Sequence, residues 1–178
     1  VLGSRGLGDV YKRQMLDSKV RSVEDLERVV RLPLLGTFPE VGNGKVKVGE
    51  EDFIQSESMQ LIRENLNYLI KRKDTPVIMV SSTIPSEGKS LVAAHLASAY
   101  ARAGKKVIVI GCDLRNPRLN EYFKREGRKG LSAYLAGMVD DPGMLVEKVN
   151  DNLHVIFGGT VPPNPTQLIA SPRMGELL

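Results

Sequence analysis

The sequence is poor in the residues that build disulfide frameworks, zinc sites and membrane spans. Its 178 residues include one cysteine, two histidines and no tryptophan. A single cysteine excludes an internal disulfide framework and fits a reducing compartment, and two isolated histidines form no His/Cys cluster of the kind that binds zinc. No apolar run approaches the roughly 18 residues that a membrane-spanning helix needs. These absences leave a soluble globular domain as the expected class.

The first 14 residues are expected to be foreign to the fold. Residues 4–14, SRGLGDVYKRQ, back-translate without a gap to a transposon-end library primer, so this stretch resembles translated sequencing adapter. Three of its residues are basic and one is acidic, which accounts for +2 of the formal net charge of +4. The remaining basic excess is weak evidence for binding nucleic acid. A reading frame that runs in from an adapter also suggests a fragment of a longer protein.

Three short apolar runs rich in β-branched residues predict buried strands, at 77–80 (VIMV), 107–110 (VIVI) and 153–157 (LHVIF). Between the first two, residues 89–104 have apolar side chains at helical spacing and end at Gly104, a typical helix stop. Strand, helix and strand within about 35 residues form a βαβ unit. The sequence therefore predicts an α/β fold with a mostly parallel sheet flanked by helices.

Further elements are expected on the N-terminal side of this core. Ser22 followed by Asp25 resembles a capping box that opens a helix running through Arg31. Residues 32–39, LPLLGTFP, predict a strand, and 56–71 a second helix. Residues 15–55 are thus expected to be a helix, a strand and a linker, and 56–178 the N-terminal part of the main domain.

On the C-terminal side, residues 113–123 and 130–137 predict two short helices. Residues 158–165 form a proline-rich loop, after which 167–178 resumes helical spacing and predicts a last helix. No internal repeat and no low-complexity tract interrupts this order.

Residues 81–90, SSTIPSEGKS, follow a predicted strand and open a predicted helix, the context expected of a phosphate-binding loop. Backbone N–H groups at the helix start would face a β-phosphate, Lys89 would bridge the β- and γ-oxygens, and the Ser90 hydroxyl would bind Mg²⁺. The general pattern has a glycine six residues before the lysine, where this chain has Thr83. The alternative is a simple strand-to-helix turn in which Lys89 is solvated.

Asp113 is expected just past the carboxyl end of the second strand, the edge at which ligands bind in open α/β sheets. Its carboxylate could orient Mg²⁺ or accept a proton from an attacking hydroxyl, or it could instead cap the following helix. Arg115 would contact phosphate or pair with Asp113. Cys112 is expected to be a small buried residue and His95 a packed or solvated one, neither of them catalytic.

Together these motifs resemble the cytoplasmic kinase domain of the bacterial tyrosine kinases (BY-kinases) of capsular and exopolysaccharide biosynthesis, the polysaccharide co-polymerase autokinases. The resemblance covers nearly all of residues 15–178. It rests, in the family's order, on SVEDLERVVRLPLLGTFPE, SESMQLIRENLNYL, SSTIPSEGKS, VIVIGCDLRNPRL, GLSAYLAG and GGTVPPNPTQLIASPRMGELL. The family's loop reads Ser-x-x-Pro-x-Glu-Gly-Lys-Ser, as residues 82–90 do, so Thr83 is expected there. The resemblance implies a P-loop NTPase-like fold, here incomplete at the C-terminus and lacking a further strand and a metal-binding aspartate.

The resemblance also implies an activity. ATP and Mg²⁺ would be the cofactors, and the γ-phosphoryl group would pass to tyrosine hydroxyls, often in a tyrosine cluster of a neighbouring subunit. Implied partners are further copies of the chain for trans-autophosphorylation, a co-polymerase membrane domain in cis or in trans, and a cognate tyrosine phosphatase, but no nucleic acid. The full-length protein would work at the cytoplasmic face of the plasma membrane. The fragment alone is expected to turn over little ATP, because its metal site is incomplete.

Carried over residue by residue, the family's Asp-x-Asp-x-Arg motif falls on Asp113 and Arg115, with Gly111 in place of the first aspartate. The family's Glu-x-x-Arg-x-x-Arg oligomerisation helix falls on Glu57 and Arg63, with a glutamine replacing the first arginine. The candidate residues are therefore Lys89, Asp113 and Arg115 for catalysis; Pro85, Ser86, Glu87, Gly88, Lys89, Ser90 and Leu91 for the nucleotide; Ser90 and Asp113 for the metal; and Glu57 and Arg63 for an oligomer interface.

Two other functions stay open. A related partitioning or septum-positioning ATPase would hydrolyse ATP without modifying tyrosine, but that group usually has an additional lysine early in the loop, where this chain has Thr83 and Ile84. A nucleotide-binding scaffold with weak or no kinase activity is suggested by Gly111. The kinase is the preferred hypothesis.

Overall fold

The structure is a computed structural model that describes residues 20, 22–39, 46–70, 75–125 and 129–178. The chain divides into two units, Val1–Leu34 and Leu35–Leu178. The adapter-like residues 1–14 lie outside the described residues. Within the described part, no helix is both long enough and apolar enough to cross a membrane.

The first unit contains the helix α2 (Val23–Val29). It begins at Ser22, whose hydroxyl accepts the backbone N–H of Asp25 at 3.2 Å, so the predicted cap is confirmed. The prediction that the helix runs through Arg31 is wrong, because Val30 is already extended at φ −111° and ψ 123°. None of the residues of α2 is buried, and a short helix without a buried face has little to stabilise its last turn.

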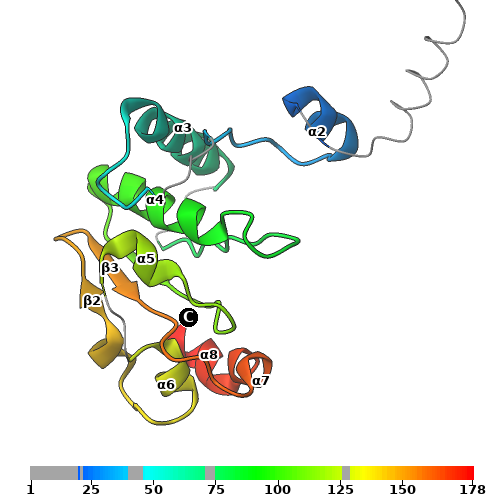
Figure 1. The fold of residues 1–178 in the computed structure, drawn as a ribbon. Coiled ribbons are helices and arrows are strands. Elements are labelled where there is room, and N and C mark those ends of the chain that lie inside the picture. The colour runs from blue at the N-terminus through cyan, green and yellow to red at the C-terminus, as the bar shows by residue number, and fades with distance from the viewer. Residues whose placement is uncertain (1–19, 21, 40–45, 71–74, 126–128) are drawn as a thin grey trace, which may run out of the picture. The chain divides into compact units, whose positions relative to one another are not determined.

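The second unit is built on a three-stranded sheet of order β1-β3-β2. Figure 1 labels the neighbouring strands β3 and β2. Strand β1 (Val107–Ile110) runs parallel to β3 (Leu153–Ile156), with Val109 opposite Val155. Strand β2 (Glu147–Lys148) is antiparallel to β3. The predicted strands at 107–110 and 153–157 are confirmed, whereas β2 was not predicted because two residues give no periodic pattern.

Two other predicted strands are wrong. Residues 76–80 are neither helix nor strand, and Val77 and Met79 are 73% and 88% exposed. A strand exists only through backbone pairing with a neighbour, and no described residue forms such a ladder with this segment. Residues 32–39 also form no strand. Leu35 and Phe38 instead pack against a small helical cluster in the second unit.

The helices of the second unit follow local signals in the sequence. α3 starts three residues earlier than predicted, because Asp52 and Gln55 form a capping box with hydrogen bonds of 2.7 and 3.1 Å. The expected end of α3, Lys71, lies outside the described residues. The predicted last helix is two helices, since Pro172 has no N–H with which to continue α7. The helices are α3 (Phe53–Leu69), α4 (Lys89–Arg102), α5 (Leu119–Phe123), α6 (Leu131–Leu135), the 3₁₀ turn η1 (Pro142–Leu145), α7 (Pro165–Ile169) and α8 (Pro172–Leu177).

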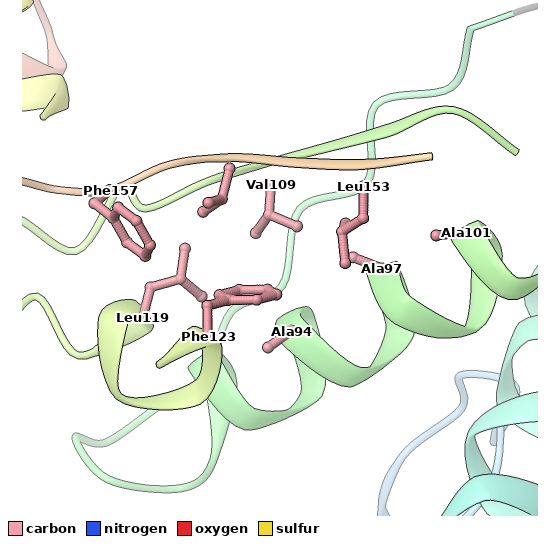
Figure 2. Packing of buried hydrophobic residues seen from close by; sticks show 9 residues of the cluster. Ala94, Ala97, Ala101, Val109, Leu119, Phe123, Leu153 and Phe157 are labelled. Carbon is pink, nitrogen blue, oxygen red and sulfur yellow. The ribbon is translucent and has the colours of Figure 1, made fainter. Parts of the chain in front are cut away.

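Side chains alternate between the two faces of β3. Leu153 and Val155 are fully buried against α4 and α5, whereas Ile156 joins a second cluster with α6 and the C-terminal helices. Figure 2 shows Ala101 of α4 near Leu153 and Ala94 nearer the Phe157 end, so α4 runs antiparallel to the strands. Small alanine side chains let the helix approach the sheet closely. The start of α4 therefore lies at the edge of the sheet where β1 and β3 end.

Candidate nucleotide site

The loop before α4 turns through two residues in the left-handed region. Ser86 has φ +68° and Gly88 has φ +98°. Glycine adopts this conformation without strain, whereas serine there has a cost of about 1–2 kcal/mol. Gly88 is also the N-cap of α4. Successive N–H groups in such a turn form a concavity that suits an anion.

Contacts within the loop involve the side chain of Glu87. Its carboxylate accepts the N–H of Ile84 at 3.2 Å and the hydroxyl of Thr83 at 3.4 Å. The Ser82 hydroxyl donates to the Ile84 carbonyl at 2.9 Å. The hydrogen bond from the Ile84 backbone is the main reason that the pKa of Glu87 is lowered, with smaller contributions from the two hydroxyls. Thr83, where the general pattern has glycine, thus helps to hold the loop.

The first residues of α4 continue from this loop. Lys89, Ser90 and Leu91 are half-buried, whereas Pro85, Ser86 and Glu87 are exposed. The N–H groups of a first helical turn have no partner within the helix, and they form the positive end of its dipole. The seven residues predicted to contact nucleotide are therefore consecutive in one turn and helix start whose backbone donors can bind phosphate.

Asp113 lies in a turn at the carboxyl end of β1. Its Oδ1 accepts the backbone N–H groups of Arg115 at 3.2 Å and Asn116 at 3.0 Å. The alternative prediction that Asp113 caps the following helix is wrong, because the N-cap of α5 is Arg118. Since the turn uses Oδ1, the second oxygen can serve a metal or a proton donor.

The side chain of Arg115 extends toward a distant part of the chain. Its Nη2 donates to Thr166 Oγ1 of α7 at 2.9 Å. No ion pair joins Arg115 to Asp113 in the described part of the chain. Thr166 follows Arg115 by 51 positions, and no local pattern in the sequence could have indicated this contact.

Gly111 occupies a crowded backbone position. A Cβ there would lie 2.9 Å from the backbone nitrogen of Gly158 and 3.4 Å from Leu119 Cδ2. Its N–H donates to the Ile156 carbonyl at 2.8 Å. The absence of a side chain at Gly111 therefore lets the end of β1 approach the residues that follow β3.

Cys112 is exposed, so the prediction that it is a buried residue is wrong. Partial desolvation by neighbouring atoms nevertheless raises the pKa of its thiol. A thiol with a raised pKa is mostly protonated at neutral pH and is a weak nucleophile. Cys112 therefore shows no feature of a catalytic cysteine.

The oxygen donors of Ser90 and Asp113 suit Mg²⁺ bound together with phosphate and water. They do not suit a metal ion whose ligands all come from the protein. Among the described residues, no group of three or more His, Cys, Asp and Glu side chains could hold a metal ion. Mg²⁺ is usually bound through one or two protein oxygens together with substrate phosphates and water. The Ser90 hydroxyl and the Asp113 carboxylate are oxygen donors of this kind.

The two residues expected at an oligomer interface have different environments on α3. Glu57 is exposed and accepts a hydrogen bond from Gln60 Nε2 at 3.4 Å. The Arg63 side chain is only 15% exposed, and its Nη1 donates to the Ala99 carbonyl of α4 at 3.2 Å. Its guanidinium also pairs with Glu64. Glu57 is thus open to a neighbouring molecule, whereas Arg63 fastens α3 to α4.

No family model matches the chain. It is 33% identical over 132 residues to the tyrosine-protein kinase YwqD of Bacillus subtilis, a match that covers 74% of this chain and 56% of the relative. It is 32% identical over 131 residues to the tyrosine-protein kinase wzc of Salmonella typhimurium, covering 74% of this chain and 18% of the relative. The chain therefore spans about half the length of the first relative and less than a fifth of the length of the second.

Two solved structures are similar over most of the chain. The chimerical protein CapA2B2 has a TM-score of 0.74 and 32% identity, over 88% of this chain and 68% of that one. The kinase domain of the Escherichia coli tyrosine kinase ETK has a TM-score of 0.78 and 26% identity, and the match covers 89% of this chain and 68% of that one. The P-loop NTPase-like α/β fold expected from the sequence is confirmed. These matches establish that the chain belongs to the bacterial tyrosine kinase (BY-kinase) family.

Proposed function

We propose that the full-length protein is an ATP-dependent protein-tyrosine autokinase that controls the chain length and export of a capsular or extracellular polysaccharide. The observation that supports this most strongly is the loop at residues 82–90. It passes through Ser86 and Gly88 with positive φ into α4, at the sheet edge where β1 ends before Asp113. The names of the relatives, which are tyrosine-protein kinases, point to phosphoryl transfer rather than to ATP hydrolysis alone.

The residues of the site would bind the nucleotide, hold the metal and accept a proton. When bound, ATP supplies the γ-phosphoryl group, and Mg²⁺ offsets the charge of the phosphates. Backbone N–H groups of residues 86–91 bind phosphate oxygens, and the Lys89 ammonium binds the β- and γ-oxygens. Ser90 and Asp113 hold the metal or its waters, and Asp113 also accepts the proton of the tyrosine hydroxyl. Arg115 would reach phosphate after leaving Thr166.

The partners and the cellular location follow from the same proposal. Further copies of the chain would phosphorylate one another, with exposed Glu57 contributing to the contact. A co-polymerase membrane domain, in cis or in trans, would hold the kinase at the cytoplasmic face of the membrane, and a tyrosine phosphatase would reverse the modification. The domain division at residue 55 stays a prediction.

The role of Asp113 can be tested with the variant Asp113→Asn in the full-length protein. We expect the rate of tyrosine phosphorylation with ATP and Mg²⁺ to fall roughly 100-fold, because asparagine cannot accept the proton of the tyrosine hydroxyl and a positioned general base contributes at least about 10²-fold. Asp140→Asn is the matched control, since the Asp140 side chain is 98% exposed.

The assay should measure both phosphotyrosine and released phosphate. The kinase predicts transfer to tyrosine that depends on Asp113. Release of phosphate without phosphotyrosine in the wild type would favour the positioning ATPase, and tight ATP binding with neither product would favour the scaffold.

A further inference from the structure

A buried histidine fastens the segment 46–51 to α4. The His95 side chain is 0% exposed, and its Nδ1 lies 2.8 Å from Glu51 Oε1. Its Nε2 lies 2.9 Å from the carbonyl oxygen of Val46. The sequence left a packed and a solvated histidine open, and the structure shows a packed one, whose two partners precede it by 44 and 49 positions. Neither contact could have been read from local spacing.

The geometry of these two contacts specifies how many protons the ring carries. A backbone carbonyl can only accept a hydrogen bond, and so can an ionised carboxylate. A neutral imidazole has one N–H, so one of its nitrogens would direct a lone pair at an acceptor oxygen. Only the imidazolium form, with an N–H on each nitrogen, donates to both Val46 and Glu51.

Glu51 supplies the balancing negative charge. Its side chain is 6% exposed, and its Oε2 accepts the N–H of Gly49 at 2.8 Å. Burial by itself raises the pKa of Glu51, but backbone N–H groups, His95 and Arg102 together outweigh burial and lower it. The carboxylate is therefore ionised at neutral pH, and a buried carboxylate of this kind requires a cation beside it.

The other groups that face His95 leave the pair largely isolated from water. The Phe38 ring lies 5.8 Å and the Tyr122 ring of α5 lies 6.4 Å from the imidazole, centroid to centroid. From α4 itself, Arg102 Nη1 lies 3.5 Å from Glu51 Oε1 and 41% of its side chain is exposed. The charged groups are thus His95, Glu51 and Arg102, and Tyr122 is the remaining titratable neighbour.

The segment held by His95 connects several elements. Val48 N–H donates to the Tyr122 carbonyl at 3.0 Å, and Glu50 pairs with Lys124 just after α5. Asp52 then caps α3. His95 itself lies about two helical turns after Gly88, on the helix that continues from the phosphate loop.

We propose that a buried His95 imidazolium, which donates from both ring nitrogens, clamps residues 46–51 to the phosphate-loop helix α4. This inference concerns the folded chain and needs neither nucleotide nor kinase activity.

The protonation state can be observed directly by NMR of the ¹⁵N-labelled full chain. Because the chain has two histidines, the variant His154→Gln leaves His95 as the single imidazole. At neutral pH we expect both ring nitrogens to give the chemical shifts of protonated nitrogens and two ring N–H signals. A single N–H with one unprotonated nitrogen at neutral pH would overturn the proposal.

The hold on this segment can be followed by amide hydrogen exchange of residues 46–51 at neutral pH. Wild type and the His154→Gln control should protect these amides equally. His95→Gln should show exchange roughly tenfold faster or more, because glutamine cannot donate to both Val46 and Glu51 in the way the imidazolium does. Should His95→Gln not fold, Glu51→Gln keeps the shape of the side chain and is expected to give the same loss. Exchange that is as slow in these variants as in wild type would contradict the clamp.

Discussion

Replacing Lys89 with methionine is expected to weaken the binding of ATP with Mg²⁺ to the chain by roughly 100-fold. Lys89 is the first residue of α4, directly after the left-handed Gly88. Methionine keeps the length and the apolar stem of the side chain but removes the ammonium. Charged hydrogen bonds to phosphate worth about 3 kcal/mol correspond to a factor of about 100 in affinity. Titration with a fluorescent ATP analogue measures the change.

Lys105→Met is the matched control for this prediction. Lys105 is exposed and lies beyond the opposite end of α4, so the substitution removes the same charge at a distance from the phosphate loop. Its affinity for ATP is expected to stay within about twofold of wild type, since an exposed lysine gives only a weak long-range contribution. Equal losses in both variants would mean that Lys89 has no specific contact with phosphate.

Replacing Gly130 with alanine is expected to destabilise the fold by about 3 kcal/mol or more. A Cβ at this position would overlap the Phe157 carbonyl oxygen and the backbone nitrogen of Gly159. Both are backbone atoms, so they cannot move aside as the end of a side chain could. Two hydrogen bonds join the start of α6 to the residues that follow β3, from Leu131 N–H to the Phe157 carbonyl at 2.7 Å and from Ser132 N–H to the Gly158 carbonyl at 3.0 Å. Chemical denaturation measures the loss in the free energy of unfolding.

Gly175→Ala is the corresponding control. Gly175 lies in α8, and a Cβ there would have no heavy atom within 4 Å. Alanine has a higher helix propensity than glycine by about 1 kcal/mol, so this variant should be as stable as wild type or slightly more stable. A Gly130→Ala variant with unchanged stability would show that Gly130 and the residues that follow β3 do not approach each other so closely.

The parts of the fold that the sequence predicted correctly depend on local patterns. The apolar runs of β1 and β3, the alanine-rich helix α4 with its stop at Gly104, and the Ser22 cap are all set by neighbouring residues. The strand predicted at 77–80 failed for the opposite reason. Its apolar composition is typical of a strand, but a strand also needs a paired neighbour, and Val77 and Met79 are exposed instead.

The candidate site shows the same division between local and distant interactions. The helix start at Lys89 could be predicted, because helix starts are local features. The helix predicted at 113–123 begins only at Leu119, and Asp113 lies in a turn before it. The contact between Arg115 and Thr166, and that between His95 and Glu51, join residues more than 40 positions apart. The crowding at Gly111 depends on Gly158 across the sheet. Such contacts arise from packing and leave no periodic signal in one sequence.

Phosphotyrosine formed by the full-length protein with ATP and Mg²⁺ tests the proposed function most directly. Wild type, Lys89→Met and Lys105→Met should be compared at equal concentrations on an anti-phosphotyrosine blot. We expect a strong signal in wild type and Lys105→Met and a signal near background in Lys89→Met. Undiminished phosphotyrosine in Lys89→Met would contradict the assignment of residues 82–90 as the loop that binds the transferred phosphate.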